Sequence, residues 1–136
     1  MNWKNRVLHV MLGPLLLIGC YEEVGGPAPT IFGRYSLRTV DGEAVPVILT
    51  DIPNFKVEIM TGTIFLNADN TFTDSTEIRR TDGQVARIVT DVAHGSFVHN
   101  GATIDLNSTR GEHYSMTLAD RTLTQNLGGN ILLYRR

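Results

Sequence analysis

Turn-forming dipeptides divide this chain into short pieces, and this division constrains its fold more than any other feature. Between the turns lie short runs rich in Thr, Val, Ile, Phe and Tyr, which are residue types that favour β-strands. Asn-Gly and Asp-Gly between such runs are the strongest local signals for β-hairpins. No run after residue 30 has apolar residues at helical spacing. The turn signals are Asp41-Gly42, residues 68–70, Asp82-Gly83, Asn100-Gly101, Arg110-Gly111, Asp120-Arg121 and Gly128-Gly129.

The runs between these turns predict eight strands joined in an antiparallel meander. The segment 43–55 contains Pro46 and Pro53, which cannot donate to a sheet ladder, so we expect an edge or a connecting loop there. The expected strands are residues 34–40, 57–66, 71–80, 85–99, 102–108, 113–119, 122–126 and 131–135.

The hairpin registers predict one apolar face and one polar face. A sheet with one apolar face must curl or pair to bury it, and closure into a barrel also removes the exposed edges. The fold class expected for residues 33–136 is therefore all-β, a single antiparallel up-and-down β-barrel of about eight strands. Short turns at Asn100-Gly101, at residues 110–112 and at Asp120-Arg121 would pair Phe97 with Ile104, Leu106 with Met116, and Leu118 with Leu123.

Residues 1–19 have the composition of an export signal. Lys4 and Arg6 give a positive start, and an apolar stretch follows over residues 7–18. This stretch is shorter than the roughly 20 residues of a bilayer-spanning helix, so it fits the apolar region of a cleaved signal peptide. Two alternatives for this region are an ordinary secretory signal, without a modified cysteine, and a buried structural role for Cys20.

Leu-Ile-Gly-Cys at residues 17–20 resembles the lipobox of bacterial lipoproteins. In that family the cysteine, whose thiolate is the nucleophile, is alkylated with diacylglycerol, the peptide is cut before it, and the new amine is acylated. The resemblance implies a lipid anchor of palmitate-like chains on Cys20. Tyr21, in place of Asp, implies sorting to the periplasmic face of the outer membrane. Residues 20–32, rich in Gly and Pro, would form a flexible tether.

The charge pattern indicates no nucleic-acid partner. The chain has 12 Lys and Arg, 14 Asp and Glu, and a formal net charge of −2, without the basic excess of nucleic-acid-binding proteins. Lys56 is the only lysine after Cys20, so we expect no polybasic membrane-binding segment, and attachment is expected to come from the lipid. The single cysteine excludes a disulfide framework. We expect a monomer without a cofactor.

Four short motifs in residues 33–136 carry a second resemblance. They are G-R-Y-S-L at 33–37, G-T-I-F-L-N-A-D-N-T-F at 62–72, G-S-F at 95–97 and L-Y-R-R at 133–136. These motifs resemble those of small bacterial lipocalin-like lipoproteins, in the lipocalin and fatty-acid-binding superfamily, with Asn70 at a usual glycine position. The resemblance implies a cation–π contact of Arg135 or Arg136 over Tyr35 that closes the barrel base.

The histidines do not predict a metal or catalytic site. His94 and His99 have opposite parity on one strand and would face opposite sides, while His113 lies beside a turn. Ser96 and Asp105 would face away from His99, so no catalytic triad is expected. No phosphate-loop, dinucleotide-binding or nucleophile-elbow motif occurs in the sequence. The sequence therefore favours a protein without enzymatic activity.

The hairpin around residues 82–83 carries the candidate ligand site. A two-residue turn there would place Asp74 opposite Asp91, and opposed carboxylates repel. Such a polar group either orients the head group of a ligand in the barrel mouth, or lies on a hairpin that projects beyond the barrel or contains a bulge. The candidate ligand-binding residues are Asp74, Arg87, Asp91, Phe97 and Met116.

Barrel size leaves two functions open. A barrel of eight strands is wide enough either to be filled by side chains or to hold one small ligand. The first possibility is a lipid-anchored cell-envelope protein that binds a small hydrophobic or lipid-like ligand. The second is a filled barrel that serves as a non-catalytic envelope scaffold or protein-interaction module.

Overall fold

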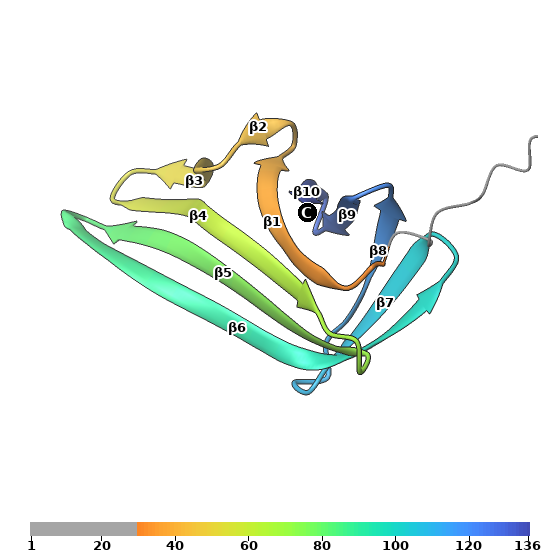
Figure 1. Ribbon diagram of the computed structural model, residues 1–136. Coiled ribbons are helices and arrows are strands. Elements are labelled where there is room, and N and C mark those ends of the chain that lie inside the picture. Colours follow the sequence, from red (N-terminus) through yellow and green to blue (C-terminus); the bar gives the residue numbers. More distant parts are fainter. Residues whose placement is uncertain (1–29) are drawn as a thin grey trace, which may run out of the picture.

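The computed structural model describes residues 30–136, which form ten antiparallel strands and no helix (Figure 1). The predicted signal peptide, Cys20 and most of the predicted tether lie outside the described residues. Within residues 30–136, no helix is long and apolar enough to cross a membrane. The strands are β1 (Gly33–Val40), β2 (Glu43–Ala44), β3 (Val47–Ile52), β4 (Phe55–Leu66), β5 (Thr71–Asp82), β6 (Val85–Asn100), β7 (Thr103–Ser108), β8 (His113–Ala119), β9 (Thr122–Leu127) and β10 (Asn130–Arg135).

Eight of these strands close into a barrel. The sheet order runs β1-β10-β9-β8-β7-β6-β5-β4, and the pairing of β1 with β4 joins its two ends. The predicted all-β, up-and-down barrel is therefore confirmed. β2 and β3 lie outside the ring, on β1 and β4 respectively. They form the predicted edge segment that contains Pro46 and Pro53.

The β5–β6 and β6–β7 turns each begin one residue later than predicted. In both turns a glycine takes the first central position with a positive φ (Gly83 61°, Gly101 60°), while the preceding Asp or Asn stays in the strand. Both are Gly-X turns and not the expected Asp-Gly and Asn-Gly turns, although either type suits a hairpin. Each pairing moves by two residues, so Asp74 faces Ala93, and the predicted opposition of Asp74 and Asp91 is wrong.

The barrel interior keeps the predicted set of apolar side chains in spite of these shifts. The β6–β7 and β7–β8 registers both differ from prediction by two residues, and the β8–β9 register is as predicted. Because strand residues alternate between faces, an even shift leaves every side chain on its predicted face. The pairs found are Phe97–Leu106, Leu106–Tyr114 and Leu118–Leu123, where Phe97–Ile104, Leu106–Met116 and Leu118–Leu123 were predicted.

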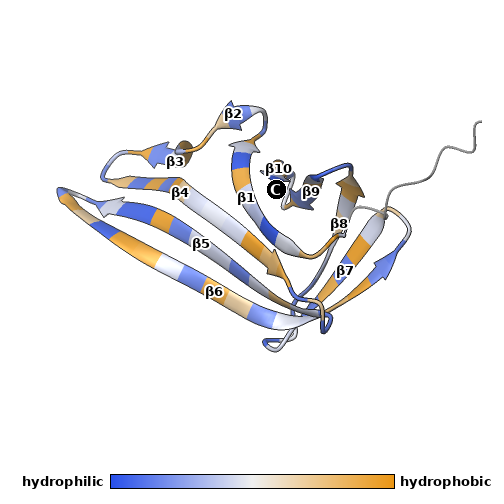
Figure 2. Cartoon of the chain, in the orientation of Figure 1, coloured by the Kyte–Doolittle hydropathy of each residue, from blue (hydrophilic) through white to orange (hydrophobic). Residues whose placement is uncertain are grey.

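Apolar and polar residues alternate along the strands (Figure 2), and most of the fully buried apolar side chains fill the end of the barrel at which β1 begins, which we call the base. The side chains of Ile64, Ile104 and Leu123 have no exposed surface. Ile31 and Phe32, which the sequence placed in the tether, pack against this core. The folded unit therefore begins before β1.

The base differs from the one that the family resemblance implied. Tyr35 is buried in the core with 1% of its surface exposed. The cation–π contact found in residues 30–136 joins Arg80 to the ring of Phe55, with 4.9 Å between the guanidinium carbon and the ring centroid. Neither Arg135 nor Arg136 makes such a contact with Tyr35 in this part of the chain. The hydroxyl of Tyr35 instead donates to the carbonyl of Ile31 at 2.7 Å.

Strands β4, β5 and β6 are longer than the barrel and extend past its other end (Figure 1). Together with β3 they form what we call the projecting sheet. The β5–β6 hairpin thus projects beyond the barrel, which was one of the alternatives that the sequence left open. Large apolar side chains of this sheet are exposed: Ile48, Leu49, Ile52, Val85, Ile88 and Val89.

Candidate functional site

A cavity of about 390 Å³ lies at the open end of the barrel, where the projecting sheet leaves the ring. This volume is within the range of small-molecule binding sites. Part of its wall is apolar, formed by Leu49, Ile59, Ile78, Ala93, Leu127, Leu132 and Tyr134. Polar side chains complete it: Asp74, Thr76, Asp91, Glu112, His113, Tyr114 and Gln125.

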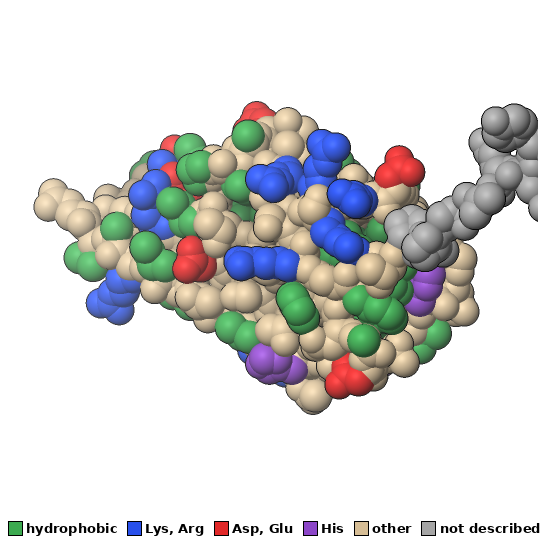
Figure 3. Space-filling view, viewed as in Figure 1, with side chains coloured by type: hydrophobic (Ala, Val, Ile, Leu, Met, Phe, Trp, Pro, Cys, Tyr) green, Lys and Arg blue, Asp and Glu red, His purple; other side chains and the backbone are tan. Residues whose placement is uncertain are grey.

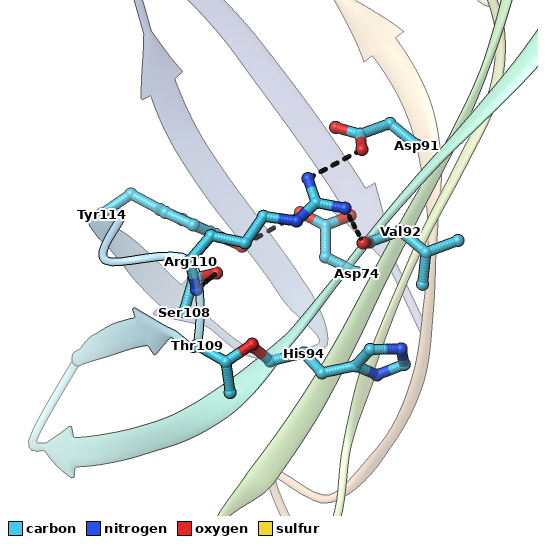
Figure 4. A network of polar contacts seen from close by, with 8 residues as sticks. All are labelled: Asp74, Asp91, Val92, His94, Ser108, Thr109, Arg110 and Tyr114. Carbon is cyan, nitrogen blue, oxygen red and sulfur yellow. Dashed lines mark hydrogen bonds and ion pairs between the residues drawn. The ribbon is translucent and has the colours of Figure 1, made fainter.

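Asp74 is the least satisfied polar side chain in this wall. Its Oδ2 accepts a hydrogen bond of 3.2 Å from the hydroxyl of Tyr114 (Figure 4). Its Oδ1 is buried and has no partner among the described residues. Burial raises the pKa of Asp74 to about 6, against the lowering effect of the Tyr114 hydrogen bond, and the charges of Asp91 and Glu112 add to the rise. The cavity therefore holds a carboxyl group that can accept a further hydrogen bond.

Tyr114 holds this carboxyl group in place. Its ring packs edge-on against Phe72, with 6.1 Å between the centroids and 81° between the planes. Burial, together with the nearby Asp74, raises the pKa of the Tyr114 hydroxyl above its usual value, so the hydroxyl stays protonated and donates. Tyr114 was not among the predicted ligand residues. Its even spacing from Met116, which is a predicted inward residue, was the signal that could have found it.

The β7–β8 loop, residues 109–112, is fastened to β6 beside the cavity. Arg110 Nη1 lies 2.9 Å from Asp91 Oδ1, and its Nη2 donates to the carbonyl of Val92 (Figure 4). The backbone N–H of Thr109 donates to the carbonyl of His94 at 2.8 Å. Asp91 raises the pKa of Arg110 through this hydrogen bond and its charge. No local pattern in the sequence indicated this contact, because it depends on the shape of the loop.

The predicted ligand residues separate into three groups. Asp74 and Asp91 line the cavity. Arg87 lies on the same face of β6 as Asp91, nearer the tip of the projecting sheet, and lines a separate depression. Phe97 and Met116, at 3% and 1% exposure, are core residues and do not line the cavity. The structure therefore brings together the two acids and not the whole predicted set.

Two arginines are opposed on the projecting sheet. Arg80 on β5 pairs directly with Arg87 on β6. Both line a depression of about 460 Å³ together with Val85 and Val89. Like charges directly opposite each other weaken a strand pair. The guanidinium of Arg80 stacks on the ring of Phe55.

His94, His113 and Asp105 each have a hydrogen-bond partner that is not a predicted site residue. His94 Nδ1 lies 3.1 Å from Thr73 Oγ1, and His113 Nδ1 lies 2.5 Å from Asn107 Oδ1. Asp105 accepts a hydrogen bond from the hydroxyl of Ser115. Within residues 30–136, no group of three or more His, Cys, Asp or Glu could hold a metal ion.

The geometry of the cavity is thus that of a small, mixed-polarity binding site. Its floor is the filled core, its walls are largely apolar, and its distinctive polar group is the buried carboxyl of Asp74. Comparison of the chain with protein-family models, with curated proteins and with solved structures gave no match.

Proposed function

We propose that this protein is a lipid-anchored cell-envelope binding protein whose barrel takes a small, largely apolar ligand through its open end. The observation that carries the proposal is the cavity of about 390 Å³, with its apolar wall and one buried carboxyl oxygen without a partner. A ligand with an apolar body and a hydrogen-bond donor would cover the wall and approach Asp74. The resemblance to lipocalin-like lipoproteins supports the same function.

A hydrophobic-probe titration tests this proposal. The protein without residues 1–20 retains every core residue of the described part of the chain, from Ile31 to Tyr134. We expect the neutral dye N-phenyl-1-naphthylamine to bind it saturably and to be displaced by unlabelled apolar compounds. Absence of saturable binding to the folded protein would contradict the cavity as a binding site.

A matched pair of variants locates the bound probe. Thr76 lines the cavity, so Thr76→Phe is expected to fill part of it and weaken probe binding at least about tenfold, since filling removes the apolar surface that the probe would bury. Thr117 lies on the outer face of β8 and is exposed. Thr117→Phe is therefore the control, and it should bind the probe like the unmodified protein.

The lipid anchor rests on the sequence of residues 17–20 and has a test of its own. We expect metabolic labelling with palmitate to mark the full-length protein, because its acyl chains would be attached at Cys20. Cys20→Ala should remove the label. Labelling that survives this substitution, or that is absent from the unmodified protein, would contradict the anchor.

Exposed apolar side chains on both faces of the projecting sheet favour a second candidate, a protein-interaction module. Ile88 at 66% exposure and Val85 at 53% lie near its tip, and large exposed apolar groups mark interaction surfaces. A folded barrel that binds no probe, but loses a captured partner on Ile88→Ser, would support this candidate over ligand binding.

A further inference from the structure

Arginines that are far apart in the sequence form one surface over the base of the barrel and the adjoining outer face of β1 and β10 (Figure 3). Arg135 on β10 pairs with Ser36, which lies between Arg34 and Arg38 on β1. The backbone N–H of Arg136 donates to the carbonyl of Arg121 in the β8–β9 turn at 3.0 Å. All five side chains are exposed. We call them the base arginines: Arg34, Arg38, Arg121, Arg135 and Arg136.

The base arginines have no acidic partner within the described residues. The three ion pairs found in residues 30–136 involve Lys56, Arg79 and Arg110 instead. Asp120, beside Arg121 in the turn, is the acidic side chain nearest to this surface in the sequence. Half of the ten Lys and Arg residues in residues 30–136 therefore lie in one patch of a chain whose net charge is negative.

The patch lies where the chain enters the barrel from its N-terminal side. The guanidinium of Arg136 donates to the carbonyl of Thr30, the first described residue, and lies beside Gly33. Residues 21–29 separate Thr30 from Cys20, and even a fully extended chain of this length spans at most about 35 Å. A lipid on Cys20 would keep the patch within that distance of the membrane. The cavity opens at the other end of the barrel, where Leu127 and Glu112 lie.

We propose that the base arginines dock on the anionic surface of the membrane in which Cys20 is anchored, so that the cavity faces away from the bilayer. This inference rests on the lipid anchor of the proposed function. Each basic side chain near an anionic lipid surface strengthens binding about fivefold. The sequence showed no polybasic segment because the arginines are dispersed over residues 34–136, and barrel closure brings them together.

Vesicle co-sedimentation of the protein without residues 1–20 tests the docking separately from the anchor. We expect binding to vesicles of phosphatidylcholine with about 30% phosphatidylglycerol at low ionic strength. Binding should be lost on pure phosphatidylcholine, and also at about 0.5 M salt, which screens surface charges. Equal binding to both vesicle types, or none to the anionic ones, would overturn the proposal.

Substitutions then identify the surface. The double variant Arg34→Gln and Arg135→Gln should bind anionic vesicles about 25-fold more weakly. Arg34→Lys with Arg135→Lys should restore binding, because a point charge is sufficient. The control is Arg80→Gln with Arg87→Gln, which removes the same charge from the projecting sheet and should bind normally. Equal weakening by both Gln variants would show an effect of net charge and overturn the patch. Circular dichroism checks that each variant is folded.

The two proposals fail in different ways. Loss of palmitate labelling on the unmodified protein contradicts the anchor, whereas vesicle binding uses a protein without Cys20 and measures the patch alone. If the unlipidated protein binds an acidic polymer such as RNA and ignores anionic vesicles, the patch is a macromolecular site of another class and the membrane proposal is wrong.

Discussion

At the scale of single residues, Asp74 is the side chain whose burial is least compensated by hydrogen bonds within the described residues. Its Oδ1 is buried without a partner in residues 30–136, and burial raises its pKa to about 6. A buried carboxyl group that pairs poorly lowers stability. Polar groups of this kind, with perturbed pKa values and placed in a cavity, are typical of functional sites.

Replacing Asp74 tests this cost. Because its pKa is higher in the folded than in the unfolded protein, the folded state holds the proton more tightly. The stabilisation that comes from binding this proton is fully present below about pH 4 and is lost as the pH rises through about 6. We expect Asp74→Asn to raise the free energy of unfolding by about 2 kcal/mol at about pH 7.5 and by little at about pH 4. Urea unfolding at both pH values measures the difference.

An exposed aspartate supplies the control for that comparison. Asp51 on β3 is exposed, so Asp51→Asn should change the free energy of unfolding by less than about 0.5 kcal/mol at either pH. If Asp74→Asn also gave the same small change at both pH values, the buried-carboxyl interpretation would be wrong.

Gly95 shows how closely β6 and β7 approach one another. A Cβ atom added there would lie 2.0 Å from the carbonyl oxygen of Asn107 and 2.7 Å from the ring of Phe72. The neighbouring atom is backbone and cannot move aside. We expect Gly95→Ala to lower the free energy of unfolding by about 3 kcal/mol. The adjacent exposed Ser96→Ala should be nearly neutral in the same thermal or urea unfolding measurement.

At the scale of elements, the long strands β4 and β5 are joined on their outer face by an ion pair. Arg79 Nε and Nη2 donate to the two carboxylate oxygens of Glu58 at 2.6 and 2.9 Å, and Lys56 Nζ lies 3.1 Å from Glu58. The Arg79 hydrogen bonds, and then Lys56, lower the pKa of Glu58 to about 2 although burial opposes them. The pair fixes the register just where the sheet leaves the barrel.

The Glu58 pair predicts a specific acid sensitivity. Since the pKa of Glu58 is lower in the folded than in the unfolded protein, its stabilisation is present above about pH 4.5 and is lost as the pH falls towards 2. Glu58→Gln should therefore lower the melting temperature at neutral pH and have a vanishing effect near pH 2. Thermal unfolding across this pH range measures it, with the exposed Glu77→Gln as the control. A constant difference between Glu58→Gln and the unmodified protein at all pH values would contradict the role of the charge.

At the scale of the whole molecule, the barrel is filled at one end and open at the other. The most buried side chains gather at the base, while the cavity wall at the open end contains partly exposed ones. The basic patch lies at the filled end and acidic side chains, Asp91 and Glu112 among them, lie around the cavity. The two ends of the barrel are thus suited to different contacts.

Matched truncations at the two ends should separate structure from function. Ile104 has no exposed surface in the core, so Ile104→Ala is expected to lower the free energy of unfolding by about 3 kcal/mol or more. Ile78 lines the cavity and is only partly buried, so Ile78→Ala should cost less than about 1.5 kcal/mol and weaken probe binding. Urea unfolding and dye titration give the two readouts. Equal stability losses would contradict a half-open barrel.

The strands and their faces could be predicted because their signals are local. Turn glycines and the alternation of apolar residues depend only on neighbours in the sequence. The barrel that these two signals predicted is confirmed by the structure. Register was harder, since a Gly-X turn and an Asp-Gly turn at Gly83 differ by two residues in pairing and leave the same face inward. That ambiguity produced the wrong Asp74–Asp91 pair.

The sequence by itself determined the fold class, the strand positions and the inward-facing set, because period-two alternation and turn chemistry act over a few residues. Only the tertiary structure decided which side chains meet across the barrel. The cavity around Asp74, the Arg110–Asp91 contact and the base arginines depend on pairings between residues such as Arg34 and Arg135, which are far apart in the chain. Such contacts follow from closure and loop length, which no local pattern specifies.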